Sequence, residues 1–317
     1  MISMPCDSPY IVSLDSPHTR TFKGKKVAIY NSDDLVYSVG VPCGRCGACR
    51  KNKVDEWSFR LRQEQKDSRT SHFVTLTYSP EHCPVSNNGF MTLERKHVTN
   101  YLKRLRSWMW RDGLRLPSLK YYCVGEYGET NERPHYHMIM LNGSVDHIVE
   151  SWCTASRGVA RGDGVPLGHV HIGNVTTDSI AYCVKYLDKR QMIPKHSRDD
   201  RVKEFSRMSQ HLGIGYLTPE MVKWHKADLS RNYIQDGPYK IALPRYYRDK
   251  IFTRGERRRQ LDEILDARDK YEVDSRREYF ADYPHGTEAD YFVNEEFKKE
   301  FRFNKYYKNG KIKKRDL

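Results

Sequence analysis

The order of hydrophobic and polar positions predicts that strands and helices alternate through the middle of the chain. Strands are expected where β-branched and aromatic residues form short runs between turn residues. The four predicted strands are His72–Tyr78, Lys120–Gly125, Pro134–Leu141 and Gly168–Val175. A short polar connection through Gly128 and Asn131 joins the second and third strands, which is typical of a hairpin.

Helical periodicity is clearest between Leu93 and Arg111, where lysine and arginine cover much of the surface outside one apolar stripe. We expect a basic amphipathic helix here. Its apolar stripe consists of Val98, Tyr101, Leu102, Leu105, Trp108 and Met109. Further helices are predicted over Lys51–Lys66, over Val145–Cys153, and from a cap at Thr177 or Asp178 to about Lys189.

These elements predict an α+β fold with a central antiparallel β-sheet flanked by helices. Their order is strand, helix, strand, strand, helix, strand, helix, and short connections favour antiparallel neighbours over a doubly wound parallel sheet. We divide the chain into an N-terminal arm with a Cys-rich turn and a helix (1–69), a core (70–190) and a basic, largely helical C-terminal extension (191–317).

The C-terminal extension is rich in charged residues. Arg254 to Arg277 carries few large aliphatic side chains, which indicates a charged helix or a hairpin of helices. The tail from Phe297 to Leu317 places lysine and arginine between aromatic residues, a pattern that suits phosphate contact with base stacking. A solvated tail is the alternative interpretation.

The overall charge narrows the choice of partner. The chain has 55 Lys and Arg against 41 Asp and Glu, a formal net charge of +14, which favours nucleic acid over an anionic membrane. No apolar run approaches the ~18 residues of a membrane span and no signal peptide is evident, so we expect a cytoplasmic protein. Its eight cysteines are too sparse for a disulfide framework and are expected to be reduced.

Two histidines share one face of a predicted strand. His135 and His137 alternate within an apolar run, and two neutral imidazoles a few ångströms apart form half of a divalent metal site. The alternative is two unrelated histidines on a partly exposed sheet. His169 and His171 repeat the spacing, as in cyclic phosphodiesterases, but that class carries His-x-Thr or His-x-Ser; we interpret this second pair as structural.

Two tyrosines lie one turn apart on the predicted 178–189 helix. At about 100° per residue, Tyr182 and Tyr186 fall nearly opposite the apolar stripe, with Lys185 and Lys189 beside them. A nearby cation favours the phenolate, so the pair are candidate nucleophiles. Packing of both rings under another layer is the alternative. The stripe consists of Ile180, Cys183, Val184 and Leu187.

A run of cysteines precedes the predicted core. Cys43, Cys46 and Cys49 have the spacing of a metal knuckle or of part of an iron–sulfur motif, but three thiols do not close a zinc site. The sequence does not select a fourth ligand. Structural zinc is one interpretation, and a turn with buried thiols is the other. The downstream candidates for the fourth ligand are His72, His82 and Cys83.

Three ordered motifs resemble those of the HUH endonucleases that initiate rolling-circle replication. They are Phe73–Tyr78, Pro134–Leu141 and Tyr182–Tyr186, and the last is similar to the two-tyrosine form with an intervening lysine. The flanking motifs Cys43–Cys49, Gly125–Gly128 and Pro244–Phe252 resemble replication initiators of gokushovirus-type single-stranded DNA phages, the Microviridae. The resemblance covers most of residues 40–255.

The resemblance implies a fold, a site and a reaction. The fold is a central antiparallel sheet with the tyrosine helix lying across it. His135 and His137 are implied to bind Mg²⁺ or Mn²⁺, with Glu126 as the candidate third ligand. Tyr182 and Tyr186 are implied as nucleophiles, with Lys185 compensating charge.

In the implied reaction, a tyrosine nicks single-stranded DNA at a replication origin. The cut leaves a 5′-phosphotyrosyl link and a 3′-hydroxyl that primes a polymerase, and the strands are later rejoined. Host helicase and polymerase are candidate partners, in the cytoplasm of the bacterial host. A relaxase or transposase uses similar residues, but the phage-like flanking motifs argue against that assignment.

Contacts to DNA are expected from basic residues of the 93–111 helix and of the tail. Tyr121, Tyr122 and Tyr136 are candidates for stacking on bases if they face outward. The rival hypothesis is a noncatalytic protein that binds single-stranded nucleic acid and whose histidines and cysteines hold structural zinc.

Overall fold

A computed structural model describes residues 6, 10–13, 19–22, 25–28, 38–44, 46–114, 117–155, 160–185 and 193–309. The chain forms two compact units, Trp57–Met221 and Met1–Glu56 with Val222–Leu317. We call the first the sheet unit and the second the helical unit, and describe each by itself. The division into three parts at residues 69 and 190 stays a prediction. No helix in the described ranges is long and apolar enough to cross a membrane.

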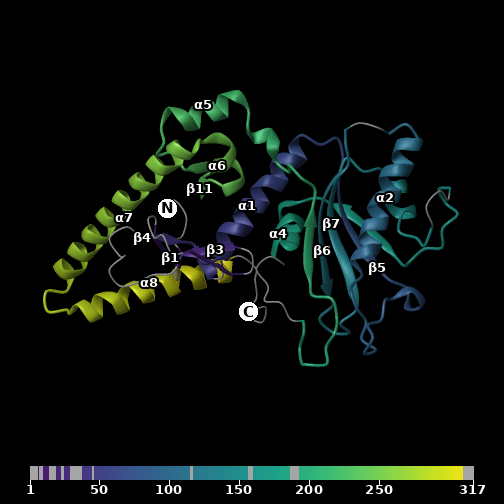
Figure 1. The fold of residues 1–317 in the computed structure, drawn as a ribbon, viewed down its shortest axis with the longest axis horizontal. Coiled ribbons are helices and arrows are strands. Elements are labelled where there is room, and N and C mark those ends of the chain that lie inside the picture. Colours follow the sequence, from purple (N-terminus) through teal and green to yellow (C-terminus); the bar gives the residue numbers. More distant parts are fainter. Residues whose placement is uncertain are drawn as a thin grey trace. The chain divides into compact units, whose positions relative to one another are not determined.

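A five-stranded antiparallel sheet forms the centre of the sheet unit (Figure 1). Its order is β8-β5-β7-β6-β9, so the predicted hairpin of β6 and β7 lies at its middle. This confirms the predicted α+β class. The strands are β5 (Ser71–Thr77), β6 (Lys120–Tyr127), β7 (Pro134–Leu141), β8 (Val170–Asn174) and β9 (Phe205–Met208).

The edge strand β9 was not predicted from the sequence. It pairs with β6 over only four positions and alternates apolar with polar residues in a short, charged segment. The sheet therefore continues beyond residue 190, where the sequence had placed the end of the core.

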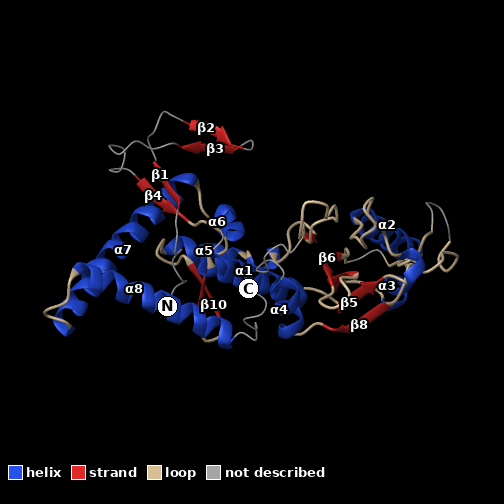
Figure 2. Cartoon of the chain, turned by 90° about the horizontal axis from the view of Figure 1, so that it is seen from below, coloured by secondary structure: helices blue, strands red, loops and turns tan. Residues whose placement is uncertain are grey.

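Helices cover both faces of this sheet. Figures 1 and 2 show α2 on one face and α4 on the other. The part of α1 from Trp57 onward lies on the α4 side, where the Trp57 and Tyr122 rings are 5.2 Å apart. The helices are α1 (Gly47–Lys66), α2 (Arg95–Arg111), α3 (Val145–Glu150) and α4 (Thr177–Lys185), with 3-10 turns at Pro80–His82 and Ile214–Tyr216.

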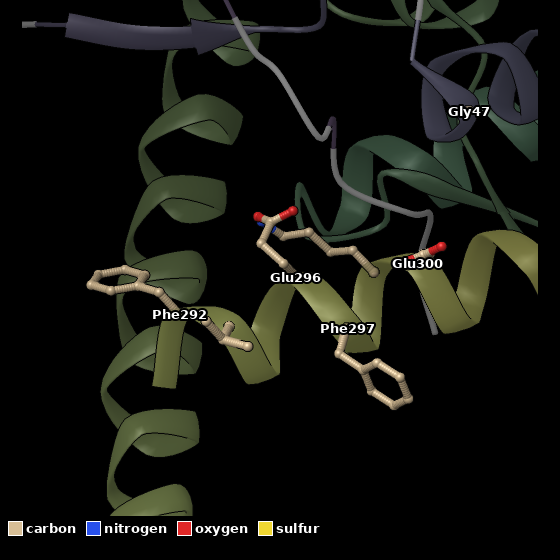
Figure 3. Close-up of a pocket in the computed structure, with 7 residues that line it drawn as sticks. Gly47, Phe292, Glu296, Phe297 and Glu300 are labelled. Carbon is tan, nitrogen blue, oxygen red and sulfur yellow. The ribbon is translucent and has the colours of Figure 1, made fainter. Parts of the chain in front are cut away.

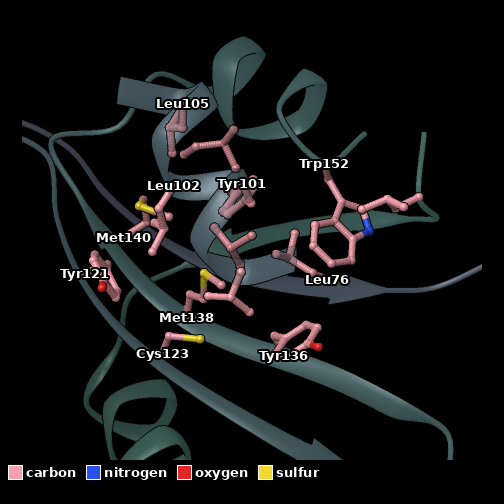
Figure 4. Packing of buried hydrophobic residues seen from close by; sticks show 14 of the residues in the cluster. Leu76, Tyr101, Leu102, Leu105, Tyr121, Cys123, Tyr136, Met138, Met140 and Trp152 are labelled. Carbon is pink, nitrogen blue, oxygen red and sulfur yellow. The ribbon is translucent and has the colours of Figure 1, made fainter. Parts of the chain in front are cut away.

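Strand alternation decides which side chains form the main core. Tyr136, Met138 and Met140 of β7 point toward α2, and Figure 4 shows these residues packed together with Leu102 and Leu105 of that helix. All six residues of the predicted α2 stripe are buried. Each such side chain contributes about 1.5–3 kcal/mol by burial. The opposite face of β7, which carries His135 and His137, is left for the site.

The helical unit contains three small two-stranded sheets and a pair of long helices. β1 (Tyr10–Ser13) pairs with β4 (Ser38–Val41), β2 (Thr19–Phe22) with β3 (Lys25–Ala28), and β10 (Tyr233–Asp236) with β11 (Tyr239–Ala242). The helices from residue 219 onward are α5 (Pro219–Ala227), α6 (Arg245–Ile251), α7 (Arg254–Asp282) and α8 (Glu288–Asn309).

The helix α7 begins with a capping box, in which Thr253 and Glu256 bond each other's backbone amides. It turns back into α8, where the Tyr279 and Tyr291 rings lie 5.5 Å apart. The predicted tail is thus helical up to Asn309, with Phe297 and Phe301 exposed.

Candidate metal and nucleophile site

The register of the central hairpin brings the predicted metal ligands together. Glu126 of β6 lies directly opposite His135 of β7. The Oε1 atom of Glu126 is 2.7 Å from Nε2 of His135 and 2.9 Å from Nε2 of His137. One carboxylate oxygen therefore faces both imidazoles on the α4 side of the sheet.

The far nitrogen of each imidazole is bonded to a fixed partner. Nδ1 of His135 is 3.0 Å from the carbonyl oxygen of Arg133, and a carbonyl only accepts, so this nitrogen carries the hydrogen. Nδ1 of His137 is 2.9 Å from Oγ1 of Thr75, and the Phe73 ring stacks on the imidazole at 5.6 Å. These contacts aim both Nε2 atoms at Glu126.

The carboxylate of Glu126 is held as an anion inside the protein. Its side chain is 4% exposed. Burial alone would raise the pKa of Glu126, but the hydrogen bonds from His135 and His137 outweigh burial and lower it. Among the described residues, its Oε2 atom is buried without a hydrogen-bond partner. A buried anionic oxygen with nothing to bond is a site for a cation.

The α4 helix points Tyr182 at this group. The Tyr182 hydroxyl lies 3.3 Å from Oε1 of Glu126 and 3.5 Å from Nε2 of His137. Ile180, Cys183 and Val184 are buried as predicted, which turns Tyr182 toward the site while leaving it 40% exposed. A phosphate approaching from solvent can therefore reach the phenol.

The start of α4 differs from the prediction. Neither Thr177 nor Asp178 caps the helix, because Oγ1 of Thr176 accepts the Ser179 amide at 3.1 Å and Oγ of Ser179 accepts the Thr176 amide at 2.8 Å. Tyr186 lies outside the described residues, as does the Lys185 side chain. Their predicted roles stay predictions.

Glu126, His135 and His137 fit a divalent cation. Their candidate ligand atoms all lie within 4.8 Å of one another. Ligands bonded at right angles to one ion at about 2.1 Å lie about 3 Å apart, close to the observed separations from Oε1. Two imidazoles and one carboxylate are the donor set of Mn²⁺ or Fe²⁺ more than of Mg²⁺, which prefers oxygen ligands.

Known proteins with similar sequences bear on the meaning of this site. Residues 71–191, which hold every residue of the site, match the family model for the replication-associated protein ORF2. The chain is 27% identical to replication-associated protein ORF2 of Spiroplasma virus 4 over 78% of its length and 82% of the relative's. The resemblance to phage replication-associated proteins is confirmed.

Further relatives extend the match beyond the sheet unit. Replication-associated protein VP4 of Bdellovibrio phage phiMH2K is 28% identical over 78% of this chain and 76% of its own length. Replication-associated protein ORF4 of Chlamydia phage 1 is 23% identical over 76% of this chain and 62% of its own length. No solved structure matches the chain.

The prediction that three tyrosines stack on bases is wrong for all three. Tyr121 and Tyr136 point into the core beside α2 (Figure 4), and Tyr122 is buried on the other face against Trp57. The β6 strand is covered on both faces, so neither of these two tyrosines of β6 is available to DNA. Tyr136 instead anchors β7, since its hydroxyl lies 2.9 Å from that of Tyr78 and accepts the Glu94 amide at 2.8 Å.

The basic helix α2 lies on the face of the sheet opposite His135 and His137. Its exposed Lys103 and Arg106 are thus separated by the sheet from a phosphate at Tyr182. Any contact they make with DNA is to a segment flanking the one in the site. Their predicted role in nonspecific affinity stays a prediction.

The second histidine pair lies on the same face as the site, which sequence reasoning missed. Thr75 is paired with His137 on one side and with His171 on the other, and directly opposite residues share a face. His169 and His171 are both exposed and lie outside the group of candidate ligands. They are placed to meet DNA that crosses β5 and β8.

A shallow hollow of about 710 Å³ lies along α8 in the helical unit (Figure 3). Glu296 and Glu300 line it together with Phe292 and Phe297. Two carboxylates repel a phosphate backbone. Its lining gives no reason to place DNA there.

Proposed function

We propose that this chain is a replication initiator that nicks single-stranded DNA at an origin and later rejoins the strands. One observation carries the proposal: the Tyr182 hydroxyl, exposed to solvent, lies beside the oxygen of Glu126 that faces both His135 and His137. The similarity to replication-associated proteins of phages supports it.

The reaction is an in-line exchange at phosphorus. The Tyr182 oxygen forms a bond to the scissile phosphorus, and the bond from phosphorus to the 3′-oxygen breaks. The phenol loses a proton and the 3′-oxygen gains one, so the exchange needs no nucleotide cofactor. A 5′-phosphotyrosyl link and a 3′-hydroxyl primer result, and attack by a later 3′-hydroxyl reverses the step.

Residues of the sheet unit prepare this exchange. His135, His137 and Glu126 would hold Mn²⁺ or Mg²⁺, which when bound would polarise the phosphate and offset the charge that develops on its oxygens. Thr75 and the Arg133 carbonyl orient the imidazoles. Tyr186, one turn after Tyr182, serves as the second nucleophile, and Lys185 compensates charge.

The polarity of the covalent link tests the proposal. The full chain is incubated with Mn²⁺ and overlapping single-stranded oligonucleotides from the genome that encodes it, each labelled at one end. A 5′-phosphotyrosyl link predicts that a 3′-label, and not a 5′-label, migrates with the protein on a denaturing gel. EDTA and the double variant Tyr182→Phe with Tyr186→Phe should abolish this band.

A matched control is Tyr239→Phe, since Tyr239 is a 72% exposed tyrosine of the helical unit. It should form as much adduct as the unaltered chain. Transfer of the 5′-label, or an undiminished adduct in the double variant, would overturn the proposed chemistry. Binding of DNA without any adduct to any oligonucleotide would favour the noncatalytic alternative.

A further inference from the structure

The helical unit contains a second group of candidate metal ligands, made only of cysteines. The sulfurs of Cys6, Cys43, Cys46 and Cys49 all lie within 4.8 Å of one another. Cys6 was not among the predicted fourth ligands, and the group includes none of His72, His82 and Cys83. The sequence left this run one ligand short, and the structure supplies that ligand.

Strand pairing explains why Cys6 joins the run. Tyr10 of β1 pairs with Val41 of β4, and Ser13 pairs with Ser38. Continuing the same antiparallel register toward the N-terminus brings Cys6 opposite the turn between Cys43 and Cys46. The small β1–β4 sheet thus brings together residues that are 37 positions apart.

The spacing of the sulfurs suits one tetrahedral ion. With zinc–sulfur bonds of about 2.3 Å, the sulfurs of a tetrahedral site lie about 3.8 Å apart. The Sγ atoms of Cys46 and Cys6 are 3.8 Å apart. A disulfide needs about 2.05 Å, and none of the described cysteines is in one. In a four-iron cluster each thiolate binds a different iron, which requires the sulfurs to be more widely separated.

Backbone amides around the group favour thiolates. The Cys43 amide donates to the Cys6 sulfur at 3.2 Å, and the Cys46 amide donates to the Cys43 sulfur at 3.3 Å. The Cys49 amide donates to the Cys46 sulfur at 3.5 Å. Hydrogen bonds of this kind orient metal-bound sulfurs and stabilise their charge.

The turn and the helix start add to this. Gly44 has φ +72°, the left-handed conformation that the turn between Cys43 and Cys46 requires and that glycine adopts without strain. Cys49 lies in the first turn of α1, where the helix dipole favours negative charge.

The geometry points to a structural zinc site formed by Cys6, Cys43, Cys46 and Cys49. Four thiolates fill the coordination sphere of the ion and leave no position for substrate, so the site is structural and separate from the one at Glu126. The zinc ties the segment before β1 to the start of α1 and closes the loop that contains β1 to β4.

Metal analysis of the full chain tests the inference. Purified protein should carry about one zinc per chain, as expected for a closed site of four thiolates. Cys6→Ser and Cys46→Ser should lower the zinc content at least ~10-fold. Cys83→Ser and Cys153→Ser, which alter cysteines outside the group, should leave it unchanged. The double variant His135→Ala with His137→Ala should keep its zinc, which separates this ion from one bound at Glu126.

Two measurements keep the test decisive if Cys6→Ser fails to fold. Cys6→His offers three thiolates and one imidazole, a set that zinc also accepts, so this variant should fold and retain the metal. Cobalt-substituted protein should show thiolate-to-cobalt charge-transfer bands and the intense visible bands of a tetrahedral site. Bound iron in place of zinc, disulfides among these four cysteines in metal-free protein, or full zinc content in Cys6→Ser would overturn the inference.

Discussion

The phenol oxygen of Tyr182 lies 3.3 Å from Oε1 of Glu126, although the two residues are 56 positions apart in the chain. Glu126 comes from the middle of the sheet and Tyr182 from the helix that covers it. Because the same carboxylate oxygen also faces His135 and His137, a phosphate that touches the phenol also lies beside the metal-binding group.

Tyr182→Phe should abolish the first cut more completely than Tyr186→Phe, because Tyr182 lies at the candidate metal ligands. Loss of a nucleophile lowers single-turnover nicking by roughly 10³-fold or more. The phenyl ring keeps its edge contacts with Phe73 and His137, so the fold should not change. Quench-flow nicking assays, with mass spectrometry of the linked peptide, measure this. A Tyr182→Phe variant that cuts at the normal rate would contradict the assignment.

Much of the sheet unit could be predicted because its signals are local. The bounds of β7 agree with the sequence prediction, since Pro134 starts an apolar run there, and the α2 stripe follows from helical periodicity. The facing of Tyr121 and Tyr122 could not be predicted, because β6 is buried on both faces and does not alternate between polar and apolar residues. Cys6 could not be assigned either, because its position depends on pairing across a long loop.

Thr75→Val should weaken metal binding by orienting His137 less well. The Thr75 hydroxyl is 2.9 Å from Nδ1 of His137, and loss of such a partner typically costs 10–100-fold in metal affinity. Mn²⁺ affinity measured by electron paramagnetic resonance or calorimetry should fall by about this factor. Nicking at saturating Mn²⁺ should recover most of its rate, because the nucleophile is untouched.

Thr77→Val is the matched control for this variant. Thr77 lies on the same strand and face, but its hydroxyl bonds the His169 carbonyl at 3.3 Å and not an imidazole. Its Mn²⁺ affinity should equal that of the unaltered chain. Equal losses in both variants would show that the Thr75 hydroxyl affects the strand in general and not His137.

Glu126→Gln should reduce Mn²⁺ affinity by about 10²-fold, because the neutral amide removes the only carboxylate of the group. In the unaltered chain Mn²⁺ should bind more tightly than Mg²⁺, since two of the three donors are imidazoles. Calorimetric titration with each ion measures both effects. Glu129→Gln, an exposed position two residues beyond β6, is the control. Tighter binding of Mg²⁺, or unchanged affinity in Glu126→Gln, would contradict the proposed ligand set.

Asp199→Asn should destabilise the sheet unit in a manner that depends on pH. Asp199 is buried and accepts two hydrogen bonds from Arg201, at 2.8 and 2.9 Å. The bonds from Arg201 hold the pKa of Asp199 well below its usual range. Removing the charge leaves the buried guanidinium with Glu132 as its remaining carboxylate partner, at a cost of about 3 kcal/mol at neutral pH.

The sign of the pH dependence follows from the lowered pKa of Asp199. The unfolded chain binds a proton at Asp199 near pH 4 while the folded chain does not, so the contribution of this carboxylate is complete above about pH 5. It declines as the pH falls below about 4, toward the folded pKa. Urea unfolding at pH 7 and pH 3 should therefore show a smaller gap between the two proteins at pH 3. Asp200→Asn, at the exposed neighbour, should change stability little, and an equal gap at both pH values would exclude the ion pair as the cause.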